Sequence, residues 1–232
     1  NTAVGASALD ANTTGSNNTG IGWGALTTST TDSANTAVGD SSLYTLNGGD
    51  YNTAIGYLSL RLATTADNCT AAGYNALGSN TTGSNNTAVG HHSLVSNTTA
   101  SDNVAVGTSS LTTNTTGEAN TAIGHKSLEN NSTASNNTAI GGFALRANTT
   151  GIENTAVGAL SLDANTTGDY NVAVGRGALT TNTTADRNTA LGVNALSANT
   201  TASYGTAVGQ AALAANTTGG GNVAIGYAAL DT

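Results

Sequence analysis

The chain has 232 residues, a formal net charge of −8 and 8% charged residues, and it contains neither Pro nor Met. Thr, Ala, Asn and Gly dominate it, with 43, 40, 30 and 30 residues. An ordinary globular domain has roughly a quarter of its residues charged, so a conventional domain with one thick mixed core is not expected. Recurring small apolar residues argue against disorder. The acidic balance argues against a nucleic-acid partner, and the lack of an 18-residue apolar run argues against membrane insertion.

A 17-residue repeat runs through the whole sequence without an insertion or deletion. Asn1-Thr2-Ala3-Val4-Gly5 returns at 18–22, 35–39 and 52–56, and the series continues to 222–226. The unit reads N-T-A-(V/I)-G-x-x-(A/S)-L-x-x-N-T-T-(G/A)-x-x, so residues 1–232 form one array of 13 full repeats and a partial fourteenth. Because the pattern is already under way at residue 1, we expect a segment of a longer fibre.

This unit predicts one coil of an all-β parallel β-solenoid. Thr, Val and Ile favour strands, and Asn and Gly at fixed offsets mark turns. Seventeen residues are too few for the helical repeat families. Equivalent residues of adjacent coils would lie about 4.8 Å apart, which gives the array a length of roughly 65 Å.

The variation between coils predicts which repeat positions face inward. All charged and aromatic side chains fall at positions 6, 7, 10, 15, 16 or 17, which we therefore expect at the surface or in loops. Position 4 is Val, Ile or Leu except for Ala72, and position 9 is always Leu, so both are expected in the core. Position 2 shares the face of position 4 because side chains alternate along a strand. The predicted core is Val4, Leu9, Ile21, Leu26, Ile55, Leu60, Val89, Leu94, Val106, Leu111, Ile123, Leu128, Ile140, Leu145, Val157 and Leu162.

Position 3 would then point outward. It is Ala in every coil except Gly20, and position 8 is only Ala or Ser. A solvated face would accept charged residues, so a face held this small is expected to pack against sister chains. The chain is therefore predicted to be a homo-oligomer whose interface comprises Ala3, Ala37, Ala54, Ala88, Ala105, Ala122, Ala139 and Ala156.

The repeat resembles a known group of proteins. Asn154-Thr155-Ala156-Val157-Gly158, followed by Ser161-Leu162 and Asn165-Thr166-Thr167-Gly168, resembles the 17-residue repeats of bacteriophage tail fibres and bacterial surface fibres. The N-T-A-V-G core is also similar to the head repeats of trimeric autotransporter adhesins. The resemblance implies a trimeric, left-handed parallel β-roll in an extracellular, cell-surface or virion fibre. A repeat specifies architecture better than ligand.

The motifs that could carry chemistry favour structural interpretations. Asn12-Thr13-Thr14 and its equivalents are glycosylation sequons, but a turn with stacked Asn amides is preferred because glycans on every coil would crowd one another. Gly5 and its equivalents lack the Lys-Ser/Thr of a phosphate loop. They are expected at a positive-φ corner or a close approach of the chain.

No catalytic, cofactor or metal site is expected. By stacking, His91 and His125 lie two coils apart, too far to share a metal ion, and the adjacent pair His91-His92 has no partner ligands. Cys69 stands alone, so it makes no disulfide framework. The scattered acids suggest no Ser-His-Asp set, and the chain is predicted not to be an enzyme.

Exposed aromatic residues offer a binding surface. Tyr57, Tyr74 and His91 occupy position 6 of successive coils and are expected to stack as a short ladder. Such rings suit contact with a glycan or a cell-surface receptor, although packing of the rings over the roll or onto a neighbouring chain is the favoured explanation. The candidate ligand contacts are Trp23, Tyr57, Tyr74, His91, Phe143 and Tyr227.

Two functions follow from these observations. The first is a structural fibre segment, a stiff spacer or head that adheres or stacks end to end into filaments. The alternative is an ice-binding solenoid that uses ranks of Thr such as Thr13 and Thr14. Adjacent residues of a strand point to opposite sides, which weakens the alternative.

Overall fold

The computed structural model describes residues 1–231, and they form an all-β parallel β-solenoid of about 13 coils of 17 residues, as the repeat predicts. Within this range there are 14 strands and no helix. The chain divides into two compact units, Asn1–Glu118 with β1–β7 and the residues from Ala119 onward with β8–β14. The strands are β1 (Thr2–Val4), β2 (Thr19–Ile21), β3 (Thr36–Val38), β4 (Thr53–Ile55), β5 (Thr70–Ala72), β6 (Thr87–Val89), β7 (Val104–Val106), β8 (Thr121–Ile123), β9 (Thr138–Ile140), β10 (Thr155–Val157), β11 (Val172–Val174), β12 (Thr189–Leu191), β13 (Thr206–Val208) and β14 (Val223–Ile225).

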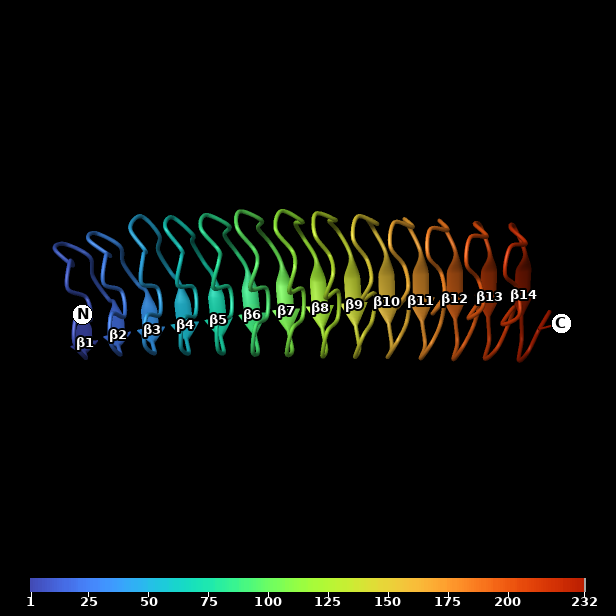
Figure 1. The fold of residues 1–232 in the computed structure, drawn as a ribbon, viewed down its shortest axis with the longest axis horizontal. Coiled ribbons are helices and arrows are strands. Elements are labelled where there is room, and N and C mark those ends of the chain that lie inside the picture. The colour runs from blue at the N-terminus through green and yellow to red at the C-terminus, as the bar shows by residue number, and fades with distance from the viewer. Residues whose placement is uncertain (232) are drawn as a thin grey trace. The chain divides into compact units, whose positions relative to one another are not determined.

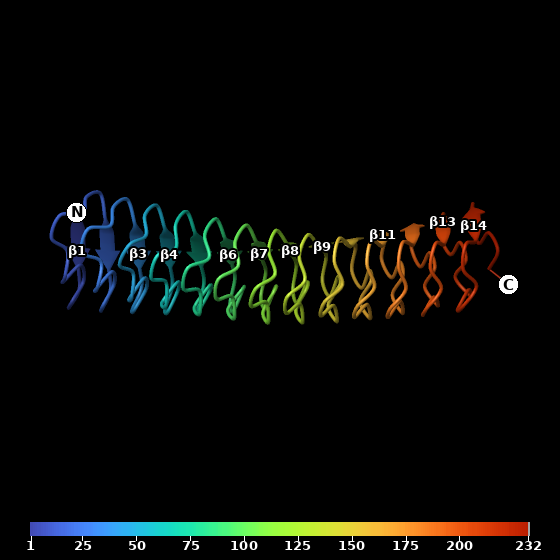
Figure 2. The ribbon, with the colours of Figure 1, turned by 90° about the horizontal axis from the view of Figure 1, so that it is seen from above.

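Within each unit every strand pairs in parallel with the strand of the next coil. The paired residues are one repeat apart, as in Thr53 with Thr70 and Ala156 with Ala173. Figures 1 and 2 show the strands of each unit side by side, with a loop on either side of every strand. The stacked register predicted from the unbroken period is therefore confirmed inside both units.

Gly at position 5 ends every strand for two separate reasons. Gly56 has a φ of +128°, a left-handed value that side chains with a Cβ disfavour. A Cβ on Gly56 would also lie 2.5 Å from the carbonyl oxygen of Gly73 in the next coil. The structure thus has both features that the sequence suggested as alternatives, a positive-φ corner and a close approach of two chain segments.

Three further positions of the coil take left-handed backbone angles. In one coil His92, Leu94 and Asp102, at positions 7, 9 and 17, have φ values of 55°, 52° and 63°. Asn tolerates this region better than most residues, which accounts for Asn68 and Asn85 at position 17. At these residues the chain turns, so that each short strand is connected to the strand of the following coil.

The Leu side chains of position 9 lie in the interior, as predicted. From Leu9 to Leu213 each belongs to the buried core, and in the central coils it has no exposed surface, whereas Leu230 of the partial last coil is 61% exposed. The buried members of the predicted set are Leu9, Leu26, Leu60, Leu94, Leu111, Leu128, Leu145 and Leu162.

The prediction for position 4 is wrong, because its branched side chains point out of the coil. Ile55 is 46% exposed and Ile123 is 38% exposed, and position 2 is on the same outer side. The residues that were expected in the core and instead lie exposed or half-buried on the outside are Val4, Ile21, Ile55, Val89, Val106, Ile123, Ile140 and Val157.

The prediction for position 3 is also wrong, because its Ala side chains line the chain's own interior rather than an outer interface. A Cβ on Gly20 would lie 3.3 Å from Leu9 Cγ, so position 3 faces the Leu of position 9. The interior is narrow, and one Leu per coil leaves room for only a methyl group opposite it. The fully buried residues of the expected interface are Ala37, Ala54, Ala88, Ala105, Ala122, Ala139 and Ala156, whereas Ala3 of the first coil is exposed.

Buried Asn side chains form another part of the interior, beside the small residues of positions 8 and 15. At position 12, Asn97 Nδ2 donates to Asn80 Oδ1 at 2.8 Å and to the Ala100 carbonyl at 2.9 Å. At position 1, the backbone N–H of Asn171 donates to Asn154 Oδ1 at 2.9 Å. Because a buried amide costs free energy unless it is hydrogen-bonded, each ladder depends on the equivalent residue of the next coil. The stacked amides predicted for the Asn-Thr-Thr turns are present.

Coils 2 to 4 depart from this interior pattern. Ser29, Leu46 and Ala63 replace Asn at position 12 and are buried. Asp32 at position 15 is 3% exposed and lies in a loop, the second of the two locations expected for position 15. In this coil position 12 carries the small Ser29 and position 15 carries the larger Asp32. Asp32 Oδ1 accepts a hydrogen bond from the Gly48 N–H at 2.7 Å.

Replacing Leu128 by Ala should lower the free energy of unfolding by about 2–5 kcal/mol, because a buried Leu is exchanged for a cavity. Leu160→Ala is the matched control, since Leu160 is 38% exposed and should change stability by no more than about 0.5 kcal/mol. Urea unfolding followed by circular dichroism measures both. Equal losses in the two variants would contradict the assignment of position 9 to the core.

Candidate interaction surfaces

Positions 6, 7 and 10 line up from coil to coil along one side of the solenoid, and we call their side chains the outer edge. The backbone fixes their register, since the His92 N–H donates to the Tyr74 carbonyl at 3.0 Å and the Asn75 N–H to the Tyr57 carbonyl at 2.9 Å. Most position-6 side chains are exposed. The outer edge is therefore a surface on which each coil can present a different side chain at a fixed spacing.

The ring ladder predicted in the first unit is present. The ring centroids of Tyr57 and Tyr74 are 5.6 Å apart, and those of Tyr74 and His91 are 5.1 Å apart and stacked at 14°. Trp23 stacks on Tyr44 of the next coil at 6.1 Å. The stacked rings cover one another's faces. A bound sugar could therefore contact only the ring edges and the faces at the two ends of each stack.

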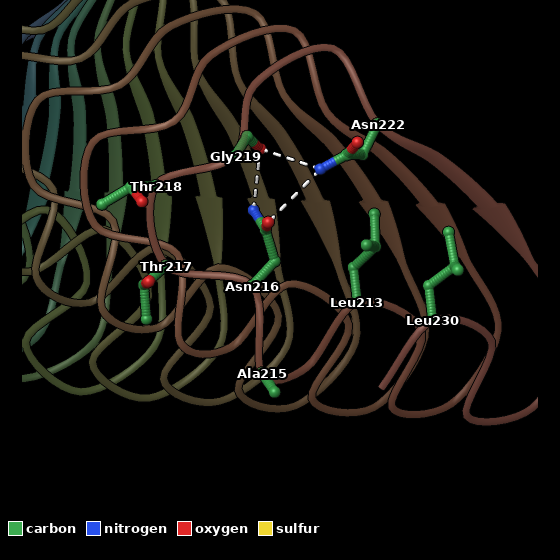
Figure 3. A pocket seen from close by; sticks show the side chains of 8 residues that line it. All are labelled: Leu213, Ala215, Asn216, Thr217, Thr218, Gly219, Asn222 and Leu230. Carbon is green, nitrogen blue, oxygen red and sulfur yellow. Dashed lines mark hydrogen bonds between the residues drawn. The ribbon is translucent and has the colours of Figure 1, made fainter. Parts of the chain in front are cut away.

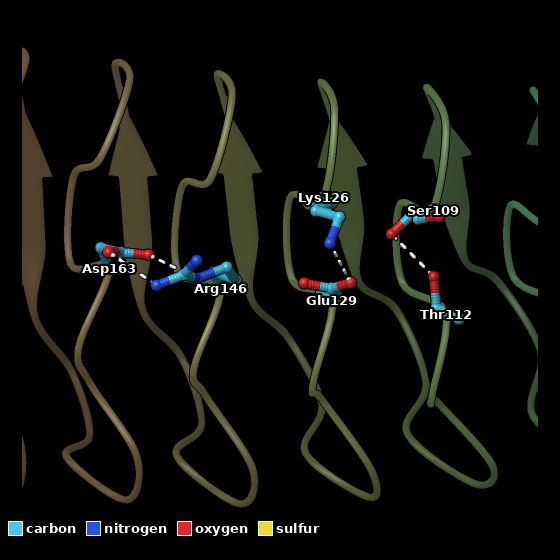
Figure 4. A network of polar contacts seen from close by, with 6 residues as sticks. All are labelled: Ser109, Thr112, Lys126, Glu129, Arg146 and Asp163. Atoms are coloured by element: carbon cyan, nitrogen blue, oxygen red, sulfur yellow. Dashed lines mark hydrogen bonds and ion pairs between the residues drawn. The ribbon is translucent and has the colours of Figure 1, made fainter.

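The outer edge of the second unit carries charged groups as well as rings. Phe143 meets His125 edge-on at 5.1 Å, and the Arg146 guanidinium lies 5.3 Å from the Phe143 ring centre. Arg146 also pairs with Asp163, with Nε 3.0 Å from Oδ1 and Nη2 donating to Oδ2 at 3.2 Å (Figure 4). Burial raises the pKa of the Asp163 carboxyl, and the neighbouring Arg146 charge opposes that rise.

Two smaller contacts continue the polar pattern. In the second unit Lys126 Nζ lies 3.1 Å from Glu129 Oε1. In the first unit Thr112 Oγ1 donates to the Ser109 carbonyl at 2.7 Å (Figure 4). Exposed pairs of this kind contribute little stability, so they fix side-chain orientation on the outer edge rather than the fold.

The sequence-predicted ligand contacts thus lie on the outer edge, but in different surroundings. Tyr227 is 79% exposed, whereas Phe143 is half-buried between its neighbours. Their role in binding remains a prediction. Sequence reasoning did not select Tyr44, which stacks on Trp23, or His92, whose ring centroid is 4.1 Å from that of His91.

A second group that was missed lies at position 17 of the second unit. The Arg187 guanidinium lies 5.0 Å from the Tyr170 ring centre and 5.8 Å from the Tyr204 ring centre. Residues spaced by one repeat stack, so the common spacing of 17 between these three residues was the signal that could have found them.

The side chains of positions 2 and 4 form a second surface, which we call the outer sheet face. Position 2 is Thr or Val, position 4 is Val, Ile, Leu or Ala, and neither carries a charge in any coil. The residues are half-buried or exposed, as in β8 and β9. Each unit therefore presents a parallel sheet covered with methyl and hydroxyl groups.

A cavity of about 350 Å³ lies in the last coils (Figure 3). Its lining is Leu213, Ala215, Asn216, Thr217, Thr218, Gly219, Asn222 and Leu230. Asn216 Nδ2 and Asn222 Nδ2 both donate to the Gly219 carbonyl, at 3.0 and 3.1 Å. Positions 9, 12, 15 and 1 line the interior of the other coils too, so this hollow is the solenoid interior open on one side. None of its lining side chains titrates.

The Asn residues of the sequons are poorly placed as glycan acceptors. Asn97, Asn148 and Asn165 have no exposed surface, and their amide nitrogens donate hydrogen bonds within the interior. Attaching a glycan to such a nitrogen would require the coil to open. The structural interpretation of these turns is thereby favoured.

Comparisons with known proteins give no assignment. The chain matches no protein-family model, and it matches no curated protein. Over residues 1–231 no helix is long and apolar enough to cross a membrane. In the same range no group of three or more His, Cys, Asp or Glu side chains could hold a metal ion.

Cys69 should react slowly with a thiol reagent in the native state. Burial raises the pKa of its thiol to about 11, and Sγ donates to the Gly83 carbonyl at 3.3 Å. Because the thiolate is the reactive form, labelling with a chromogenic disulfide at pH 8 should require unfolding and accelerate sharply in urea. Native labelling as fast as that of the unfolded chain would contradict the buried position.

Proposed function

We propose that the chain is a structural segment of an extracellular or virion fibre. The observation that carries this proposal is the continuous hydrogen bonding between successive coils of each unit. In the coil of residues 69–85, the N–H groups of Thr70, Leu77 and Thr81 donate to the next coil at 2.8, 3.1 and 2.8 Å. Gly73 and Asn85 donate to the preceding coil at 2.8 and 3.0 Å.

Such bonding suits a mechanical role. It runs along the stacking direction, so pulling two neighbouring coils apart must break several backbone hydrogen bonds at once. Threonine hydroxyls add to it, since Thr81 Oγ1 donates to the Thr98 carbonyl at 2.9 Å and Thr166 Oγ1 to the Thr183 carbonyl at 3.0 Å. The left-handed twist, the trimeric state and the surface location belong to the proposal through the resemblance to tail-fibre and adhesin repeats.

The outer sheet face is the surface through which we propose that copies of the chain associate. Burying the Val and Ile side chains of this face against a partner would contribute about 25 cal/mol per Å² of apolar surface removed from water. No charged residue on this face opposes its burial. The outer edge, in contrast, carries charged side chains such as Lys126 and Arg146. A second copy with the same uncharged face is the simplest complementary partner.

The size of the face is sufficient for this purpose. Three residues at about 3.3 Å and strands about 4.8 Å apart give about 48 Å² per coil. Seven strands per unit then give roughly 330 Å² on each unit, comparable with the largest patch on a typical monomer. If both units take part, two copies bury roughly 1,300 Å², above the roughly 1,000 Å² of a specific interface.

Two adjacent residues provide the test. Ile123 is on the outer sheet face and Ala122 is in the interior. Ile123→Glu should leave the far-ultraviolet spectrum intact but dissociate the oligomer, because an unpaired charge enters an apolar contact. Ala122→Glu should instead unfold or strongly destabilise the coil. Sedimentation velocity and circular dichroism separate the two effects.

The control is Thr150→Glu, which adds the same charge at an exposed turn position and should preserve both fold and assembly. An Ile123→Glu chain that sediments like the unmodified oligomer would exclude the outer sheet face as the interface. An unmodified chain that is a folded monomer at nanomolar concentration would exclude self-association altogether.

Ice binding is the second candidate, and the same face favours it. The sequence pointed to Thr13 and Thr14, but position-13 hydroxyls are used between coils, as in Thr13 Oγ1 to the Thr30 carbonyl at 3.1 Å. The outer sheet face instead repeats Thr-x-Val or Thr-x-Ile at the strand spacing, as in Thr138 and Ile140. An uncharged surface with regularly spaced rows of hydroxyl and methyl groups can order water molecules.

Thermal hysteresis of a dilute solution distinguishes the two functions. If the face binds ice, the unmodified chain should be monomeric and depress the freezing point below the melting point. Thr138→Lys should then reduce the gap, because a charged side chain disrupts the regular face, whereas Thr150→Lys should not. An oligomer without measurable hysteresis would exclude ice binding and leave the fibre function.

A further inference from the structure

His91 and His92 lie side by side on the outer edge of the first unit. His91 is exposed and His92 is half-buried. In an extended strand, neighbouring side chains point to opposite sides. Here His92 has a φ of 55°, and this left-handed turn brings the two imidazoles together with ring centroids 4.1 Å apart.

We propose that this pair is a bidentate site for a divalent transition-metal ion of the Cu²⁺ type, with the remaining coordination positions open to water or to an external ligand. Imidazole nitrogen is a preferred ligand of copper, nickel and zinc. The proposal is independent of the fibre function and of any face used for self-association.

The separation of the two rings fits a chelate. A metal ion lies about 2.0 Å from an imidazole nitrogen, and the ring centre is about 1.1 Å further away. Two such ligands meeting a tetragonal Cu²⁺ ion at about 90° place their ring centres roughly 4.5 Å apart. The observed separation of 4.1 Å is close to this value.

The surroundings orient the pair and leave it free to bind a cation. The Tyr74 ring of the preceding coil lies against both imidazoles, 5.1 Å from His91 and 5.2 Å from His92. On the outer edge of this coil and of the coils before and after it, the sequence has no Lys or Arg.

Only two protein ligands are available, in agreement with the lack of any larger cluster of metal-binding side chains between residues 1 and 231. A site of this kind is open rather than closed. It suits reversible binding of the metal and contact with a third ligand, and it differs from a structural zinc site with four protein ligands.

The test uses the whole chain without an affinity tag. Titration with Cu²⁺ alone, followed by calorimetry, should show one dominant site per chain, and electron paramagnetic resonance should show two imidazole nitrogens on the ion. Removing a residue that only hydrogen-bonds to a metal ligand lowers metal affinity about 10–100-fold. His91→Gln and His92→Gln each remove a ligand itself, so each should weaken Cu²⁺ binding at least about tenfold.

The matched control is His125→Gln, because His125 occupies position 6 in another coil and contacts Phe143 rather than a second imidazole. This variant should bind Cu²⁺ like the unmodified chain. Circular dichroism confirms that each variant is folded. Unchanged affinity in the double variant His91→Gln/His92→Gln would overturn the proposal, and so would a spectrum of the unmodified chain with only one coordinated nitrogen.

Discussion

The narrow interior of the coil limits which side chain each repeat position can carry. Except in the coil that buries both Leu43 and Leu46, it holds one Leu per coil, and the small position 3 faces this Leu, as the 3.3 Å between Leu9 Cγ and a Cβ on Gly20 shows. Close packing leaves no space for a second branched side chain on the opposite wall. Val and Ile of position 4 are consequently displaced to the outside, where they create an apolar outer sheet face. The interior size thus determines the chemistry of the surface.

The same constraint explains why so much of the interior is polar. With so little apolar surface to bury, the coil fills its corners with Asn at positions 1 and 12. Burying an amide is unfavourable unless all its hydrogen bonds are made. Stacking provides them, as when Asn182 Nδ2 donates to Asn165 Oδ1 at 2.9 Å and to the Ala185 carbonyl at 3.1 Å. Each coil is therefore completed by its neighbour, as in other repeat architectures.

The sequence predicted the period, the parallel register, the buried Leu rank, the stacked Asn amides and the ring ladder of Tyr57, Tyr74 and His91. All of these follow from residues that recur at a fixed spacing. It did not predict which side of the strand faces inward, because alternation allows two phases. The larger side chains were assigned to the core, whereas the width of the coil admits only the smaller set. The close contact between the His91 and His92 rings was not predicted, because the left-handed backbone angle of His92 cannot be recognised from the sequence.

The two outer surfaces differ in how much their residues vary from coil to coil, and therefore in the partners that they suit. The outer sheet face is nearly the same in most coils, since Thr36 and Val38 are followed one repeat later by Thr53 and Ile55. A uniform surface can extend a contact along its length, so it suits a partner that is itself regular, such as another copy of the chain or an ordered water layer. The outer edge changes from coil to coil, from the Trp23–Tyr44 stack to the His91–His92 pair. Because the backbone register is fixed by the uniform positions, a substitution at position 6, 7 or 10 changes local chemistry without changing the fold. A ligand that requires particular residues would therefore bind at the outer edge, while the self-association that we propose would use the outer sheet face.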